Sequence, residues 1–484
     1  MERIASGIEG LDAILGGGFF RGGVTIVQGT PGTGKTILGN QLCFNHARAG
    51  GRALYVTLLA ESHARMLLHL GDLEFYDQSA IPDRVYYISA FSILQTEGLP
   101  GLQAFLRREV IARGATLLVL DGLVAAERQA GSELEFKVFT HELQAQATLT
   151  GCTMFLMTSS DTNGPGANAE HTMVDCVIQL HSRLHGWRAG RELEVVKRRG
   201  AAFLRGRHAF RITDAGIVVY PRLEALLATP SAHARHDGDR VGSGEPTVAL
   251  MLGGGLPRNS MTMLVGPSGV GKTTLALQFL GACSAEEPGV LFSCSESRGG
   301  LLAKARAMGL PAAQHLEQDV IDLLWQPSTE SLLDETCGRL LHAVRQRGAR
   351  RLVIDGIGGL IRLAPDPGRI AHIFAALVHE LPAMGVTTVF TAEADDAGPN
   401  HPLPPFGPLT TSLSRTAENI IVMRLVESRS TLVRLIQVLK ARHSRIDPRS
   451  HTFEVDSTGL VIAPSPDEAE AVLSRLHSPW RREE

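Results

Sequence analysis

Two short segments of the chain combine glycines, a lysine and a threonine at a spacing suited to holding phosphate. They read GTPGTGKT at 29–36 and GPSGVGKT at 266–273. In this pattern backbone N–H groups surround a phosphate, the lysine reaches the outer phosphoryl oxygens, and the hydroxyl binds Mg²⁺. A helix that follows adds the positive end of its dipole. The sequence therefore predicts two nucleotide sites, each with a bound Mg²⁺.

The predicted phosphate-binding residues are both segments and the threonine after the second. They are Gly29, Thr30, Pro31, Gly32, Thr33, Gly34, Lys35 and Thr36, and Gly266, Pro267, Ser268, Gly269, Val270, Gly271, Lys272, Thr273 and Thr274. Thr36 and Thr273 are also predicted magnesium ligands.

An acidic residue ends an apolar run downstream of each segment. LLVLD ends at Asp121 and RLVID ends at Asp355. A carboxylate at the end of such a strand is typical of the second magnesium-binding element of P-loop proteins. We expect Asp121 and Asp355 to complete the two metal sites, although capping of the next turn is the competing interpretation.

A glutamate follows another predicted strand in each half, Glu61 in VTLLAES and Glu296 in FSCSES. A carboxylate there can orient or deprotonate the water that attacks the terminal phosphate. Because a serine follows each glutamate, capping of the next helix by Ser62 and Ser297 is the alternative. We favour the catalytic interpretation for both glutamates.

Basic residues end a further apolar strand in each half. Lys197 and Arg199 lie in LEVVKRRG, and Lys440 and Arg442 lie in IQVLKAR. The residues leave two interpretations open. The charges either solvate a strand edge and discourage aggregation, or they reach the terminal phosphate bound by a neighbouring subunit.

The two halves are copies of one another. Shifted by 237, residues 3–36 fall on 240–273 with 14 identities in 34 positions. A segment rich in Pro, Gly, Ser and His separates the copies, which is linker composition. We expect a first ATPase domain at 1–228, a linker at 229–246, a second ATPase domain at 247–464 and a short tail at 465–484.

Apolar runs alternate with helical patterns in both halves. The expected strands are 24–29, 53–59, 117–123 and 152–160 in the first half, and 262–267, 290–296, 351–357 and 387–393 in the second. Buried strands separated by helices predict the α/β class, with a mostly parallel sheet covered by helices on both faces in each domain.

Composition excludes several classes of protein. The chain has 484 residues, of which 44% are hydrophobic, so wholesale disorder is excluded. Lys and Arg total 47 against 50 Asp and Glu, a balance that makes nucleic acid an unfavoured partner. The six cysteines lack zinc or redox spacing, and neither a signal peptide nor a membrane helix is expected. A reduced, cytoplasmic protein is the expectation.

With these elements the chain resembles the KaiC-type ATPases of the RecA/RadA superfamily, the circadian clock protein KaiC family, over about residues 3–464. The most specific parts are R-x-x-[ST]-G…L-GGG-x-x-[RK] before each P-loop, the strand-end acid and the late K-x-R. The resemblance implies tandem RecA-like domains in a two-tiered hexameric ring, with ATP between subunits and signalling proteins as partners. It also implies that Lys197, Arg199, Lys440 and Arg442 act on a neighbour's ATP.

The chain departs from the family at two places. The family has paired glutamates where this chain reads Leu59-Ala60-Glu61 and Ser295-Glu296, so only one acid of each pair is present. Its autophosphorylated Ser-Thr pair corresponds here to Ser414 and Arg415, with Thr416 one residue further on. Ser414 and Thr416 are therefore the candidate phosphorylation sites that the resemblance implies.

Three functions remain at this point. The first is an ATP-hydrolysing KaiC-like oligomer that is also a serine/threonine autokinase and acts as a signalling or timing module. The second is a DNA-dependent recombination ATPase of RecA/RadA type. The third is a scaffold whose subunits are joined by bound ATP, of which little is hydrolysed.

Overall fold

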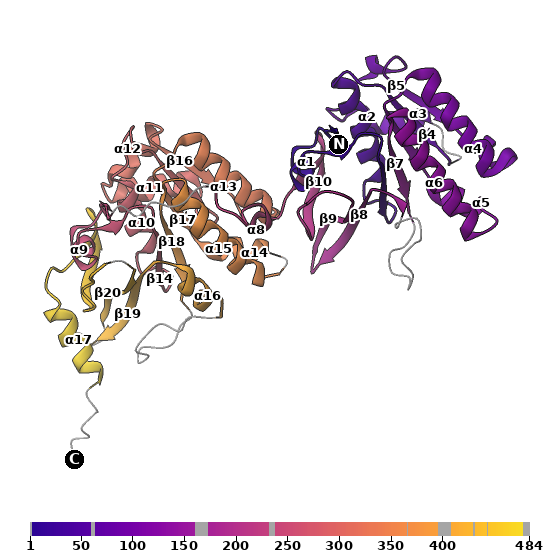
Figure 1. Ribbon diagram of the computed structural model, residues 1–484. Helices are drawn as coiled ribbons and strands as arrows, with labels where there is room; N and C mark the ends of the chain where they lie inside the picture. The colour runs from indigo at the N-terminus through magenta and orange to yellow at the C-terminus, as the bar shows by residue number, and fades with distance from the viewer. Residues whose placement is uncertain are drawn as a thin grey trace. The chain divides into compact units, whose positions relative to one another are not determined.

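The computed structural model describes residues 2–59, 63–159, 173–231, 238–364, 366–394, 408–428, 431–442 and 444–477. The chain divides into two compact units, Met1–Leu226 and Leu227–Glu484, each built on one large sheet (Figure 1). Within the described residues, no helix has the length and apolar content needed to cross a membrane.

The first unit contains a sheet of nine described strands. In spatial order these are β11 (Gly216–Tyr220), β10 (Arg207–Thr213), β9 (Arg188–Arg198), β8 (Cys176–His185), β3 (Val24–Gly29), β7 (Thr153–Thr158), β6 (Leu117–Asp121), β4 (Ala53–Thr57) and β5 (Val85–Ser89). The strands from β8 to β5 run parallel, and β9, β10 and β11 continue the sheet antiparallel. The carboxyl ends of β3 and β6 therefore meet at one edge.

The second unit repeats this arrangement. Its described strands lie in the order β16 (Ile321–Trp325), β15 (Gly289–Ser293), β17 (Arg351–Asp355), β18 (Thr387–Glu393), β14 (Met261–Gly266), β19 (Asn419–Ser428), β20 (Thr431–Ala441), β21 (His451–Asp456) and β22 (Gly459–Ile462). Six are parallel and the last three are antiparallel. A short antiparallel pair precedes each sheet, β1 (Arg3–Ile4) with β2 (Phe19–Phe20) and β12 (Arg240–Val241) with β13 (Leu256–Pro257).

Helices cover both faces of the first sheet because its strands are apolar on both sides. Val27 packs with α1 (Glu9–Ile14), α2 (Lys35–Arg48) and α3 (His63–Leu70). The preceding residue, Ile26, points to the other face and packs with α4 (Phe91–Arg113), α5 (Leu123–Gln129) and α6 (Glu133–Thr150). A further short helix, α8 (Leu223–Leu226), ends the unit.

The second sheet is covered in the same way. One core joins its strands to α9 (Pro246–Met251), α10 (Lys272–Leu280), α11 (Arg298–Ala307) and α12 (Pro311–Glu317). The strands also contact α13 (Leu333–Arg347), α14 (Ile357–Leu363) and α15 (Gly368–Ala383), and the rings of Phe374 and Phe390 lie 5.3 Å apart. Helix α16 (Pro408–Thr416) packs against α15. The predicted fold class, two mostly parallel α/β domains, is confirmed.

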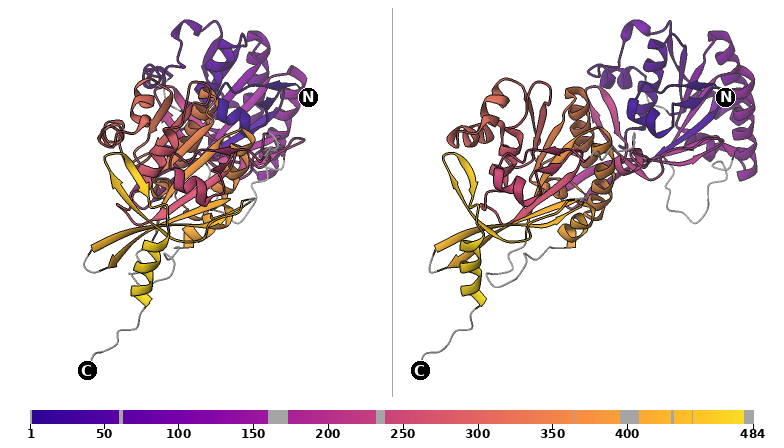
Figure 2. Two further views of the ribbon diagram at one scale, coloured as in Figure 1. Left: turned by 90° about the vertical axis from the view of Figure 1, so that its left-hand side faces the viewer. Right: turned by 60° about the vertical axis from the view of Figure 1, so that its left-hand side comes forward.

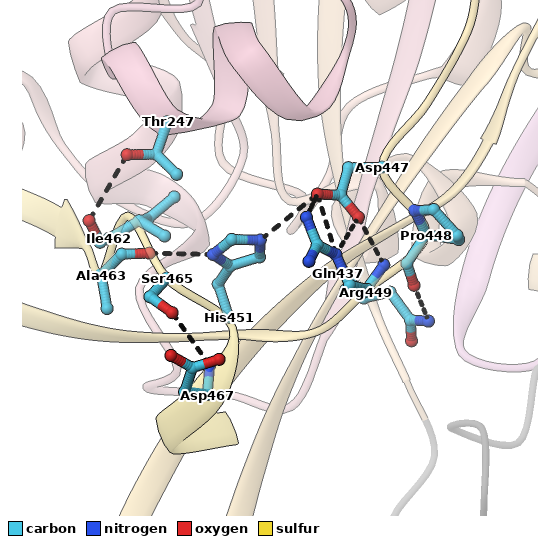
Figure 3. A network of polar contacts seen from close by, with 10 residues as sticks. All are labelled: Thr247, Gln437, Asp447, Pro448, Arg449, His451, Ile462, Ala463, Ser465 and Asp467. Carbon is cyan, nitrogen blue, oxygen red and sulfur yellow. Dashed lines mark hydrogen bonds and ion pairs between the residues drawn. The ribbon is translucent and has the colours of Figure 1, made fainter. Parts of the chain in front are cut away.

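The last described element is helix α17 (Asp467–His477), which lies against the antiparallel strands of the second unit (Figure 2). Ala469 and Val472 share a small core with Val426 and Leu435. Before this helix, the Nδ1 atom of buried His451 donates to the carbonyl of Ala463 at 2.8 Å (Figure 3). These contacts hold α17 and the segment before it to the sheet of the second unit.

Candidate nucleotide-binding sites

Each glycine-rich segment forms the turn between a central strand and a helix. Strand β3 ends at Gly29 and α2 begins at Lys35, and in the second unit β14 ends at Gly266 and α10 begins at Lys272. Gly34 and Gly271 have φ values of 104° and 120°, a conformation that side chains disfavour. The predicted strand–turn–helix context of both P-loops is therefore present.

The two P-loop lysines fold back over their own turns. Lys35 Nζ donates to the carbonyls of Gly29 at 2.7 Å and Thr30 at 3.1 Å. Lys272 Nζ donates to Gly266 and Pro267 at 2.8 Å each. Burial lowers the pKa of both ammonium groups, against nearby carboxylates that raise it. Both cations thus lie over the turn that would enclose a phosphate.

The threonine and aspartate predicted to hold magnesium meet in both units. Thr36 Oγ1 lies 3.4 Å from Asp121 Oδ2, and Thr273 Oγ1 lies 3.2 and 3.1 Å from the two oxygens of Asp355. Burial raises the pKa of Asp355, while hydrogen bonds from Thr391 and Thr273 lower it. The pairing of a hydroxyl with a carboxylate supplies the hard oxygen ligands that Mg²⁺ prefers.

A pocket of about 650 Å³ opens at the second P-loop, a volume typical of small-ligand sites. Its lining includes Ser268, Gly269, Gly271, Lys272, Thr273, Thr274, Glu296, Lys304, Asp355, Thr391 and Glu393. Across the described ranges, no three His, Cys, Asp or Glu side chains cluster as a metal site. Mg²⁺ is usually bound by one or two carboxylates and the phosphates of the nucleotide.

Glu296 lies in the loop after β15 and lines this pocket. Its carboxylate is ion-paired with Lys304 of α11. The neighbouring Ser297 caps α11, its hydroxyl accepting from Gly300 N at 3.4 Å. Capping and a pocket-facing carboxylate therefore coexist in adjacent residues, where the sequence presented them as alternatives.

The two predicted glutamates lie at different distances along the sequence from equivalent strand residues. Thr57 pairs with Asp121 and Ser293 pairs with Asp355, so Thr57 and Ser293 correspond. Glu296 follows Ser293 by three residues, whereas Glu61 follows Thr57 by four. Glu61 itself lies outside the described residues.

The basic pairs lie away from the P-loop of their own domain. Lys440 pairs with Ile420, which pairs with Met263, three residues or roughly 10 Å before the end of β14. Lys197 is related to β3 in the same way, through Val177 and Ile26. Lys440 Nζ donates to the carbonyls of Ser414 and Ala417, and Arg442 to that of Arg415. The carbonyl groups at the carboxyl end of a helix carry partial negative charge, which stabilises the nearby cations of Lys440 and Arg442.

Ser414 and Thr416 are on α16, beside this basic pair. The Ser414 hydroxyl donates to the carbonyl of Thr411 at 2.8 Å and the Thr416 hydroxyl to that of Ser412 at 3.2 Å. Such bonds to the preceding turn are common for helical serine and threonine.

Three residues of the two sites were absent from the sequence predictions. Tyr55 donates its hydroxyl to Asp121 Oδ2 at 2.7 Å, Thr391 donates to Asp355 Oδ1 at 2.8 Å, and Lys304 pairs with Glu296. A hydroxyl inside an apolar strand was the only signal for the first two. No sequence signal pointed to Lys304, because lysines are common on the exposed faces of helices.

Two P-loops, each facing a strand-end aspartate at the carboxyl edge of a mostly parallel sheet, define a tandem RecA-like nucleotide-binding protein. A family model described as "ATPase: KaiC" matches residues 4–224 and 243–467, so the chain belongs to the KaiC ATPase family. Both domains are ATPase domains of that family.

Similar full-length proteins agree with this membership. The chain is 27% identical to the "Circadian clock oscillator protein KaiC" of Picosynechococcus sp. over 98% of this chain and 92% of that protein. The protein of the same name from Rippkaea orientalis is 27% identical over 98% and 91%, and that from Synechococcus elongatus is 27% identical over 96% and 90%.

Proposed function

We propose that both domains bind ATP with Mg²⁺ and that the protein hydrolyses it. One observation carries the proposal: in each domain the P-loop threonine contacts the strand-end aspartate. Thr36 with Asp121 and Thr273 with Asp355 would hold the ion. Mg²⁺ would neutralise charge on the phosphates, while Lys35 and Lys272 would hold the outer phosphoryl oxygens. ATP turnover that requires Mg²⁺ and is lost when both lysines are replaced tests this proposal.

Glu296 is the residue that we propose to orient or activate the attacking water in the second domain. It lines the pocket at the second P-loop, and its negative charge adds to burial in raising the pKa of Asp355. Glu61 is the corresponding proposal for the first domain, on the sequence alone.

We propose that the protein assembles into a ring, a hexamer by its resemblance to the family, with each basic pair acting on the ATP of the next subunit. The position of the pair supports this proposal, because Lys440 lies roughly 10 Å along the sheet from its own P-loop. A residue at that distance from its own P-loop is better placed to serve a neighbour's site.

Mixing experiments test this arrangement. Arg442→Ala alone is expected to lower second-domain ATP turnover about 100-fold, the scale of a lost charge-stabilising donor. Mixed with Lys272→Ala subunits, it should recover activity, since Arg442 of one subunit then faces ATP on the other. Arg449→Ala, an exposed arginine paired with Asp447, is the matched control. Mixtures no more active than the sum of their parts would contradict action across subunits.

We propose a second activity, autophosphorylation of Ser414 or Thr416, as part of a signalling or timing role. The relatives are named as clock oscillator proteins, and both hydroxyls lie on the helix whose carbonyls bind Lys440 and Arg442. A DNA-dependent recombination ATPase is not favoured by these relatives or by the net charge of −3. Nucleic acid is therefore not among the proposed partners.

Incubation with Mg-ATP followed by phosphopeptide mapping tests the autokinase activity. Phosphate is expected on Ser414 or Thr416, and Ser414→Ala with Thr416→Ala should remove it. Thr410→Ala on the same helix is the control. An unlabelled helix at saturating ATP, in protein that turns over ATP, would leave hydrolysis as the only activity.

A further inference from the structure

Tyr55 is a buried tyrosine whose hydroxyl contacts Asp121, a predicted magnesium ligand. It lies in the middle of β4 with no exposed surface. A buried phenol needs a hydrogen-bond acceptor. Here the acceptor is Asp121 Oδ2, at 2.7 Å, and Thr36 Oγ1 lies 3.4 Å from the same oxygen. Tyr55 therefore holds the carboxylate from inside the sheet, while Thr36 approaches from the P-loop.

The second domain orients its carboxylate by a different element. The strand register places Leu291 where the first domain has Tyr55, since these residues pair with Val353 and Val119, each two positions before the aspartate. Leu291 is fully buried and cannot donate a hydrogen bond. Asp355 instead receives a hydrogen bond from Thr391 of β18, where the first domain has Met157. Each aspartate therefore accepts a hydrogen bond from a hydroxyl of a neighbouring strand, Tyr55 of β4 in the first domain and Thr391 of β18 in the second.

We propose that Tyr55 is a positioning residue that orients Asp121 for the Mg²⁺ of the first nucleotide site. A hydrogen bond to one carboxylate oxygen restricts rotation about the Cβ–Cγ bond, and outer partners of this kind tune metal binding. The inference rests on the proposed binding of Mg-ATP. Its consequence is that the Tyr55 hydroxyl determines how strongly Mg²⁺ tightens nucleotide binding in the first domain only.

Equilibrium binding of a fluorescent ATP analogue tests this inference without relying on turnover. The full-length Lys272→Ala variant reports on the first site, and its affinity is measured with Mg²⁺ and with EDTA. Tyr55→Phe is expected to reduce the gain in affinity from Mg²⁺ about tenfold, the lower end of effects at such outer partners, and to leave the affinity in EDTA unchanged.

Tyr87→Phe is the matched control. The Tyr87 ring lies 5.5 Å from that of Tyr55, but its hydroxyl donates to Asn40 Oδ1 at 2.7 Å and does not contact the carboxylate. This variant should keep the full gain from Mg²⁺. In the Lys35→Ala background, Tyr55→Phe should leave the second site unchanged, which excludes a general loss of folding.

An unchanged or larger gain from Mg²⁺ in Tyr55→Phe would overturn the positioning role, since the hydroxyl would then be a core contact or a competitor of the ion. Equal losses in Tyr55→Phe and Tyr87→Phe would overturn it too. If the Lys272→Ala parent gains nothing from Mg²⁺, the proposed magnesium site fails, and the inference fails with it. The parent measurement separates these failures.

Discussion

Replacing both P-loop lysines, Lys35→Ala with Lys272→Ala, is expected to weaken ATP binding about 1,000-fold at each site. Each ammonium is partly buried over its turn, and removing one member of a buried charge pair costs roughly 4 kcal/mol. If ATP joins adjacent subunits, the double variant should also assemble poorly. Nucleotide titration by calorimetry and sedimentation at matched concentrations measure the two effects.

The single variants separate the two sites. Lys35→Ala should remove one class of binding site and Lys272→Ala the other, so that half of the bound nucleotide remains in each. Lys137→Ala, an exposed helix lysine paired with Glu133, controls for loss of a surface charge. An unchanged affinity in the double variant would show that the lysines do not bind phosphate.

Glu296→Gln is expected to lower ATP turnover by the second domain about 1,000-fold with little change in ATP affinity. An amide keeps the shape of the side chain but can no longer accept the proton of water, and general-base catalysis contributes 10²- to 10⁴-fold. The measurement is single-turnover hydrolysis in the Lys35→Ala background, beside nucleotide binding by the same protein.

Lys304 makes this experiment sharper, because Glu296 has a structural partner as well as a place in the pocket. If Glu296 only anchors Lys304, then Lys304→Gln should reproduce the whole loss. If Glu296 acts on water, Glu296→Gln should lower ATP turnover far more than Lys304→Gln does. Glu317→Gln breaks a comparable ion pair with Arg306 outside the pocket and should have no effect. Glu61→Gln, measured in the Lys272→Ala background, asks the same question of the first domain.

The local parts of the two sites could be predicted because their chemistry is encoded within a few residues. The glycines, lysine and threonine of a P-loop lie within one short segment, so the pattern can be recognised from the sequence alone. Asp121 and Asp355 were found in the same way, since each ends an uninterrupted apolar strand. The duplication added a second copy of each signal.

Contacts between strands far apart in the sequence could not be predicted. Tyr55 and Asp121 are 66 residues apart, and only the pairing of β4 with β6 makes them neighbours. The equivalence of positions in the two domains also depends on strand register, because loops of different length shift the numbering. Spacing in the sequence aligns Glu61 with Glu296. The strand register instead aligns Thr57 with Ser293, and the two alignments differ by one residue.

The two P-loop domains, the residues expected to enclose phosphate and the family resemblance could all be inferred before the structure was known. These features are local or repeated, and short-range backbone geometry is enough to produce them. The hydroxyl that contacts each aspartate, and the distance of each basic pair from the P-loop of its own domain, became known only from the folded structure. Those properties follow from strand order and register, which are set by the packing of the whole domain.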